Sequence, residues 1–397
     1  MANSSPSTIN RSPRDNGYED EHVGRTVKRE QKVTFLACLL GAVASIGGFM
    51  FGYVRYDSHF FFLSLLLQWD RGKSDNSCSG QISGFFLMKD YSRRFGQLQP
   101  DGSFTFSAAR QGTIVGMLSV GCLIGALISG KLADVIGRKF AISAAALWAW
   151  VGTIIEISSS SHWVQFAMGR FTTGISIGAL SVLVPMYQSE SSPAILRGVI
   201  VACYQLFVTL GIWTAEMVDW GTESRSDSAS WRIPNGLTFL WALLLASGIL
   251  FLPESPRYAY RKGRVEEARY TIAGLAGADP HSITVTKEMQ DIQAKLDEEN
   301  AATKTHWYEI FTGPRMFYRT ILGIVLQAGQ QLCGVNYFFY YGTTAFQSTG
   351  ISNSYTTQLI LGSVNVICTI AGLYIVANVG RRKALMAGAA WMMMCFL

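Results

Sequence analysis

The chain has 397 residues and a formal net charge of +6, and 49% of its residues are apolar while only 15% are charged. Soluble domains carry about 25% charged residues, so an ordinary soluble domain is excluded. The mean hydropathy is +0.23, and the apolar residues form long uncharged blocks. Because roughly 20 such residues cross ~30 Å of hydrocarbon as a helix, we predict an all-α, polytopic membrane protein.

The expected elements follow in chain order. Residues 1–32 are polar and are predicted to form a disordered tail. Membrane spans are predicted at 33–54, 111–130, 140–158, 163–186, 198–218, 235–252, 319–346 and 355–378, with a ninth opening near 384. The chain thus divides into a tail (1–32), a six-helix bundle (33–252), a polar linker with short amphipathic helices (253–318) and an incomplete second bundle (319–397).

The distribution of Lys and Arg predicts the orientation of the spans. Basic residues precede the first span and fill the 131–139 loop, whereas the linkers at 158–162 and 347–355 carry none. The positive-inside rule therefore places the N-terminus and the 131–139 loop in the cytoplasm. The net positive charge is explained by this topology, so we predict no nucleic-acid partner. The seven cysteines are scattered without a CxxC pair, which indicates neither a disulfide framework nor a zinc site.

One inter-helix turn, Gly130–Phe140, reads GKLADVIGRKF. Gly137 permits a tight turn, and Asp134 is placed either to pair with Arg138 or to accept a hydrogen bond from a helix N-terminus. Positive-inside bias alone would explain the bases but neither the acid nor the glycines. A related turn, ANVGRRKAL at residues 377–385, occupies the same place in the second half and carries Arg381 and Arg382. Duplicated halves with a site between them are typical of secondary carriers.

The fourth span and the loop after it carry a second group of small and charged residues. Gly174 and Gly178 are spaced for close helix packing. Glu190 and Arg197 end two consecutive spans, where we expect them to form an ion pair that opens at modest cost. The segment PESPR, which contains Glu254, repeats this arrangement after the sixth span.

Five motifs occur in order: GRFTTGISIG, PMYQSESSPAILRG, PESPR, QQLCGVNYFFYYG and NVGRRKAL. In this order and spacing the chain resembles the sugar porter family of the major facilitator superfamily over about 33–55 and 81–397, and most of all its fungal hexose transporter and glucose sensor branch. The resemblance implies a two-bundle major facilitator fold, alternating access and a sugar site between the bundles. It also implies a cytoplasmic gate made by Asp134, Arg138, Glu190, Arg197, Glu254, Glu309, Arg381 and Arg382.

The same resemblance implies the residues that bind the sugar. They are Gln205 in the fifth span, Gln330, Gln331 and Asn336 in the seventh and Asn365 in the eighth, with Tyr340 and Tyr341 covering the sugar or forming an outer gate. Carboxamides suit a hexose because they offer donors and acceptors to its hydroxyls without a charge to desolvate. The alternative is that these amides join neighbouring helices by hydrogen bonds.

Three departures from the family pattern matter. Val54 stands where family members that couple to protons carry an acid, which argues against proton coupling. The predicted transport is either facilitated or proton-coupled. Residues 56–79 interrupt an otherwise continuous segment, and their apolar core is too short to span. We predict an aberrant insertion such as a retained intron or a gene-model error. The chain also stops inside the ninth span, so we expect this polypeptide not to transport and the function to belong to a longer form.

Two other functions remain open from the sequence: a sugar sensor of the same fold that signals without transport, and a non-functional truncated product. An enzyme is not predicted, because the chain has no HExxH, GxSxG or phosphate-loop motif. No cofactor is predicted. The expected partners are a small-molecule sugar, a proton if transport is coupled, and the lipid bilayer, with the plasma membrane as the expected location. Glucose, other hexoses, pentoses and quinate-like polyols would all suit an amide-lined cavity.

Overall fold

The structure is a computed structural model that describes residues 34–55, 85–86, 88–100, 102, 104–193, 196–301, 316–332 and 354–396. Seven helices in this described part are long and apolar enough to cross a membrane. Hydrocarbon offers backbone N–H and C=O groups no water, so such runs satisfy them as helices. The prediction of an all-α, polytopic membrane protein is confirmed.

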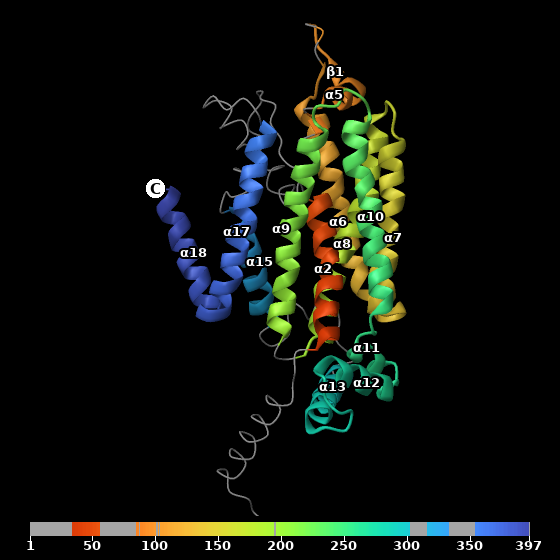
Figure 1. Ribbon diagram of the computed structural model, residues 1–397, viewed down its shortest axis with the longest axis vertical. Helices are drawn as coiled ribbons and strands as arrows, with labels where there is room; N and C mark the ends of the chain where they lie inside the picture. Colours follow the sequence, from red (N-terminus) through yellow and green to blue (C-terminus); the bar gives the residue numbers. More distant parts are fainter. Residues whose placement is uncertain are drawn as a thin grey trace, which may run out of the picture.

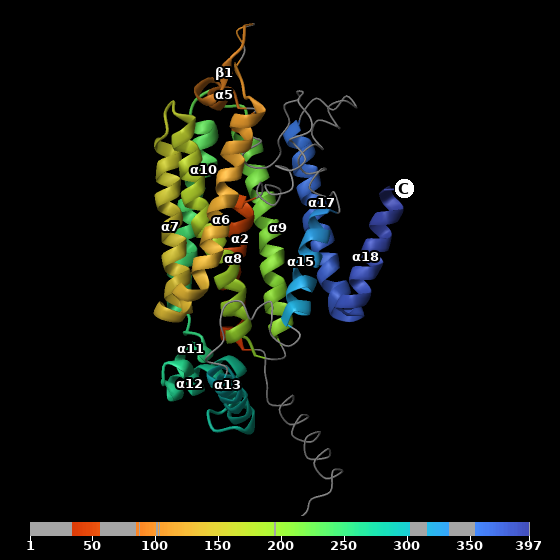
Figure 2. The same cartoon turned by 180° about the vertical axis from the view of Figure 1, so that it is seen from behind.

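The first six of these helices form one bundle (Figures 1 and 2). They are α2 (Phe35–Arg55), α6 (Ala108–Ile136), α7 (Arg138–Ser158), α8 (Trp163–Ser191), α9 (Arg197–Thr222) and α10 (Ala229–Phe251). Their bounds lie near the predicted spans, but α6 runs beyond the predicted 130 to Ile136. It continues because the turn does not come until Gly137, whose φ of +100° favours glycine.

Glycines let α6 and α8 approach closely. A Cβ at Gly174 would meet the backbone carbonyl of Leu118, and one at Gly178 would meet that of Cys122. In return, Gly121 and Gly125 of α6 face the backbone of α8. The predicted role of Gly174 and Gly178 in helix packing is thereby confirmed.

Buried polar contacts fix the other helices of the bundle. Tyr53 Oη donates to the carbonyl of Pro234 at 2.8 Å, which joins α2 to α10. Gln188 Nε2 donates to Ser45 Oγ at 2.9 Å, which joins α8 to α2. This amide therefore links helices, the role that was the alternative for the predicted sugar-binding amides.

Three short helices lie under one end of the bundle (Figure 1). They are α11 (Pro256–Arg261), α12 (Val265–Ala276) and α13 (Ile283–Ala301). Ile272, Val285, Met289 and Ile292 are buried where these helices pack together. The two amphipathic helices predicted in the linker are present as α12 and α13.

The opposite end of the bundle carries a small element that the sequence reading missed. It consists of α5 (Lys89–Phe95) and a hairpin of β1 (Gln97–Leu98) and β2 (Phe104–Thr105), which pair antiparallel with Gln97 opposite Thr105. Tyr91 and Phe95 are buried against Phe166 and Trp231. Trp231 Nε1 donates to Asp90 Oδ2 at 3.1 Å, and Arg110 Nη1 of α6 donates to the carbonyl of Phe95 at 2.8 Å. This cap is therefore held on the bundle by aromatic packing and several polar contacts.

Three further helices lie on the α9 side of the bundle: α15 (Met316–Leu332), α17 (Ser354–Val379) and, farthest out, α18 (Arg381–Phe396) (Figures 1 and 2). Among them, α17 packs against α9. The predicted tail (1–32) and insertion (56–79) lie outside the described residues, and the division of the chain into bundles and linker stays a prediction.

Candidate functional site

One face of α9 carries polar side chains within a membrane span. Gln205, Glu216 and Asp219 are separated by 11 and 14 residues, close to whole numbers of helical turns, so they share one face. Glu216 and Asp219 are buried, with 4% and 3% of their surface exposed, whereas Gln205 is exposed.

This face of α9 meets α17. Trp213 Nε1 donates to Ser363 Oγ at 3.0 Å, and the Glu216 carboxylate lies directly against Gly362, where an added Cβ would collide with it. Asn365 is half-buried one turn along α17 from Gly362, on the same helix face. A helix of the first half and a helix of the second half thus meet through polar groups.

Two of the predicted sugar-binding amides, Gln205 and Asn365, lie on the two helices of this interface but at different depths. Glu216 and Gly362 are in contact and mark a common level on the two helices. Gln205 lies 11 residues, or ~16 Å, from this level along α9. Asn365 lies three residues, or ~4.5 Å, from it along α17. Because α9 and α17 run in opposite directions (Figure 1), both lie toward α11–α13 from the Glu216 level, ~12 Å apart along the axes. Asn365, rather than Gln205, therefore lies at the depth of Trp213 along the helix axes.

The structure describes only some of the other predicted sugar-binding residues. Gln330 and Gln331 lie in the last turn of α15, which ends at Leu332. Asn336, Tyr340 and Tyr341, and Glu309 of the predicted gate, lie outside the described residues.

The structure brings the predicted gate residues of the first half together around Arg138. This side chain is buried, and its Nε lies 3.0 Å from Glu190 Oε2 while its Nη2 donates to Glu190 Oε1 at 3.3 Å. Its Nη1 lies 3.1 Å from Asp134 Oδ1. The predicted pairing of Asp134 with Arg138 is confirmed, and Glu190 joins the same cluster.

Glu254 completes this cluster by capping a helix. Its Oε1 accepts hydrogen bonds from the backbone N–H groups of Arg138 at 3.1 Å, Lys139 at 3.2 Å and Ser255 at 2.9 Å. The first two N–H groups open α7 and have no partner within the helix. A carboxylate also suits the positive end of the helix dipole, so Glu254 ties the end of α10 to the start of α7.

Further contacts attach α11 to the same turn. Arg261 Nη1 lies 3.1 Å from Asp134 Oδ1, and Tyr258 Oη donates to the carbonyl of Val135 at 3.0 Å. Ser255 Oγ donates to Glu190 Oε2. The ends of four membrane helices and one short helix are therefore joined by a single polar network.

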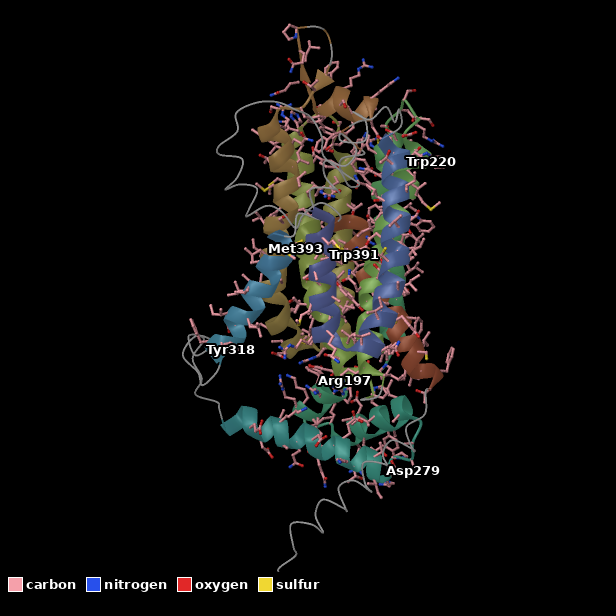
Figure 3. All side chains as sticks on the ribbon, turned by 90° about the vertical axis from the view of Figure 1, so that its left-hand side faces the viewer. Arg197, Trp220, Asp279, Tyr318, Trp391 and Met393 are labelled. Atoms are coloured by element: carbon pink, nitrogen blue, oxygen red, sulfur yellow. The ribbon has the colours of Figure 1, made fainter. Side chains whose placement is uncertain are left out.

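Arg197 pairs differently from the expectation. Its Nη2 lies 3.8 Å from Glu288 Oε1 on α13 and donates to the carbonyl of Ser192 at 3.2 Å, and Figure 3 labels it between the bundle and the short helices. The expected pair of Glu190 with Arg197 was wrong, because Glu190 is turned toward Arg138. Burial raises the pKa of Glu288, and this outweighs the lowering by Arg197 and Arg257.

The second Gly-Arg turn has the backbone form of the first. Gly380 has a φ of +87°, and α18 begins at Arg381 directly after it, as α7 begins at Arg138 after Gly137. Arg382 is exposed on this turn. The predicted repeat is confirmed in backbone geometry.

The chain from residue 40 to 397 matches the family model described as "Sugar (and other) transporter". This match covers far more than half of the chain. The chain belongs to the sugar transporter family.

Curated members of the family from Saccharomyces cerevisiae are similar over most of the chain. The low-affinity glucose transporter HXT1 is 40% identical over 366 residues, which are 92% of this chain and 60% of HXT1. The hexose transporter HXT10 is 44% identical over 320 residues, which are 80% of this chain and 59% of HXT10. The chain thus spans about three fifths of the length of these transporters.

Solved structures confirm the major facilitator fold. The proton:xylose symporter XylE, with bound 6-bromo-6-deoxy-D-glucose, gives a TM-score of 0.67 at 22% identity and covers 89% of this chain and 71% of its own. The partially occluded inward-open form of XylE from E. coli gives a TM-score of 0.64 at 21% identity, over 88% of this chain and 75% of its own.

Several residues of this sugar transporter family member were missed from the sequence. Glu288 lies in a run of mixed charges on α13 that carries no motif, and only its contact with Arg197 sets it apart. Trp213 and Ser363 are uncharged residues 150 positions apart. The polar face of α9 could have been predicted, because Glu216 and Asp219 are acids within an apolar span and such residues mark functional sites. Among the described residues, no group of His, Cys, Asp or Glu could hold a metal ion.

Proposed function

We propose that this chain is the larger part of a carrier that moves a monosaccharide, a hexose such as glucose, across the membrane by alternating access. The polar contact between α9 and α17, held by the Trp213–Ser363 hydrogen bond at 3.0 Å, carries the proposal. It puts hydrogen-bonding groups where the two halves meet, which is where secondary carriers bind substrate. Membership of the sugar transporter family supports a sugar as that substrate.

In this proposal, amides from separate helices hold the hydroxyls of the sugar. Gln205 and Asn365 come from α9 and α17, and Gln330 and Gln331 from α15, with Asn336 following in the chain. Each amide offers two donors and one acceptor without a net charge, so the sugar exchanges its water for protein groups at little cost. Tyr340 and Tyr341 cover the apolar face of the ring.

The polar network around Arg138 serves as a gate in this proposal. It joins the ends of α6, α7 and α8 to α11 through Asp134, Glu190 and Glu254. We propose that the remaining predicted gate residues belong to the same gate: Arg197, Glu309, Arg381 and Arg382. Rocking of the two halves would break some of these contacts and form others, so the gate has two alternative sets of pairs.

The placement of basic residues supports a cytoplasmic N-terminus and a cytoplasmic position for α11–α13. The yeast hexose transporters to which the chain is similar support a plasma-membrane location. Val54 occupies the place of the first-helix acid of proton-coupled members, which argues against proton coupling and leaves facilitated transport as the simpler mode.

Uptake of labelled glucose in cells that lack their own hexose carriers tests the proposal. We expect uptake by a form that spans the full length of the related transporters. Asn365→Leu should lower uptake at least tenfold in the long form, whereas Asn378→Ala, at an exposed amide bonded to its own helix, should not. A panel of sugars with and without a protonophore identifies substrate and coupling. Glucose binding without uptake of any sugar would refute transport and support a sensor.

A further inference from the structure

A cavity of about 170 Å³ lies where the start of α9 meets the short helices α11, α12 and α13. It is separate from the interface between α9 and α17. Ile272 and Ile292 give it an apolar side. Four basic side chains line it: Arg197, Arg257, Lys287 and Lys295. Figure 3 shows the position of Arg197 at this junction.

Three acids also line the cavity, but two of them already have basic partners. Glu190 is held by Arg138 at 3.0 Å. Glu288 faces Arg197 at 3.8 Å. Asp291 is the third, and it lies exposed on α13 one turn from Lys287 and one turn from Lys295.

The basic residues that remain give the cavity a positive excess. Arg257, Lys287 and Lys295 make no ion pair within the part of the chain that the structure describes. Lys287 and Lys295 are eight residues apart, so they stand on one face of α13, two turns apart. With Asp291 as the single acid between them, the cavity retains an excess of positive charge.

We propose that this cavity binds a phosphate monoester, with its phosphoryl oxygens held by Arg197, Arg257 and Lys287 and its charge balanced further by Lys295. Arginine and lysine bind phosphate through charge-assisted hydrogen bonds, and the guanidinium fork of arginine adds two-point recognition. A single water needs roughly 10–15 Å³ of this kind of volume. The cavity of about 170 Å³ is many times larger, so a phosphoryl group fits in it.

The bound phosphate would replace Glu288 as the partner of Arg197. Their present separation of 3.8 Å is longer than the ~2.7–2.9 Å of a strong charge-assisted hydrogen bond, so a phosphoryl oxygen can approach Arg197 more closely. The raised pKa of Glu288 shows that its charged form is poorly stabilised here. Glu288 therefore competes with the phosphate, and its removal should strengthen binding.

Such a phosphate group has two possible sources, a free metabolite or a lipid headgroup. The test uses glucose 6-phosphate as the free probe and nanodiscs of phosphatidylcholine with or without phosphatidylinositol 4-phosphate as the lipid probe. Saturating glucose is present throughout to occupy the proposed sugar site. Binding of glucose 6-phosphate to the purified chain is measured by calorimetry. Binding of either probe is also measured as a shift in the melting temperature of the purified chain.

We expect at least one probe to bind. The double variant Lys287→Gln/Lys295→Gln should weaken that binding at least tenfold, and Glu288→Gln should tighten it several-fold. Lys131→Gln removes an exposed lysine outside the cavity and should leave binding unchanged. A response to the free probe identifies a metabolite site, and a response only to the lipid nanodiscs identifies a headgroup site.

No binding of either probe to the wild-type chain would overturn the proposal. Equal binding by wild type and the double lysine variant would also overturn it. The opposite effects expected for the lysine and glutamate variants cannot come from general unfolding, which would weaken binding in both. Because the readout is binding rather than uptake, failure here leaves the proposed transport function untouched.

Discussion

The carboxylate of Glu254 accepts a hydrogen bond from the backbone N–H of Arg138 at 3.1 Å, although the two residues are 116 positions apart in the chain. A side chain from the end of α10 thus caps the first turn of α7. This contact requires the chain to pass Glu254 closely, and Gly137 provides the space: a Cβ there would lie 2.5 Å from Glu254 Oε2.

The first prediction concerns two glycines of the same motif. Gly137→Ala should destabilise the protein by about 1–3 kcal/mol, because alanine is strained at positive φ and would displace Glu254. Gly130→Ala should instead be neutral or stabilise by up to about 1 kcal/mol, since Gly130 lies within α6 with open space around it. Melting temperatures in detergent compare the two, and equal effects would contradict this account of the turn.

The second prediction separates two carboxylates that pair with the same guanidinium. Glu190→Gln should cost about 3–5 kcal/mol, because the side chain of Arg138 is only 5% exposed and would keep a buried charge with less compensation. Asp134→Asn should cost less than about 1 kcal/mol, because Asp134 is 51% exposed. Denaturant unfolding of both variants gives the two losses of unfolding free energy. A larger loss for Asp134→Asn than for Glu190→Gln would show that burial does not govern this network.

The third prediction concerns pH and Glu288. Burial raises the pKa of this residue above the ordinary 4.5. The charge of Asp291 raises the pKa further, and the charges of Arg197 and Arg257 each lower it by less than burial raises it. The folded state therefore binds the proton more tightly than the unfolded state. The resulting stabilisation is fully present below pH 4.5 and is lost as pH rises through the raised pKa.

Glu288→Gln removes this titration. As pH rises from 4.5 toward neutrality, the melting temperature of the wild type should fall relative to that of Glu288→Gln. The two proteins share all other titrating groups, so the difference reports on Glu288. Melting curves of both proteins across this range give the difference directly. A difference that does not change with pH would show that the pKa of Glu288 is the same in the folded and unfolded chain.

The fourth prediction concerns the contact between α6 and α8. Gly178→Ala should destabilise by about 1–3 kcal/mol, because the new methyl group would press on the backbone of Cys122 and separate the helices. Gly112→Ala lies in the same helix pair but faces open space, so it should be neutral or slightly stabilising. Size-exclusion chromatography after heating detects the difference, and tolerance of alanine at Gly178 would mean that the helices do not need close approach.

The sequence alone was sufficient for the seven spans that the structure describes, for α12 and α13, and for the pairing of Asp134 with Arg138. Each of these depends on residues close together in the chain. Residues 333–346 of the predicted 319–346 span lie outside the described residues. The cap formed by α5 and the β1–β2 hairpin could not be predicted, because Tyr91 and Phe95 are buried only by Phe166 and Trp231 from distant helices. Of the predicted sugar site, the sequence suggested Asn365, but the partners at its interface, Trp213 and Ser363, carried no pattern.

Local hydrophobicity determined that this chain crosses the membrane many times, since an apolar run of that length can satisfy its backbone in hydrocarbon only as a helix. Which charges meet was decided by the tertiary structure. Glu190 lies seven residues before Arg197 yet pairs with Arg138, 52 residues away, because the packing of α8 beside α7 turns its carboxylate toward that turn. Arg197 is left to meet Glu288 on α13, a contact that exists only once the linker helices fold beneath the bundle.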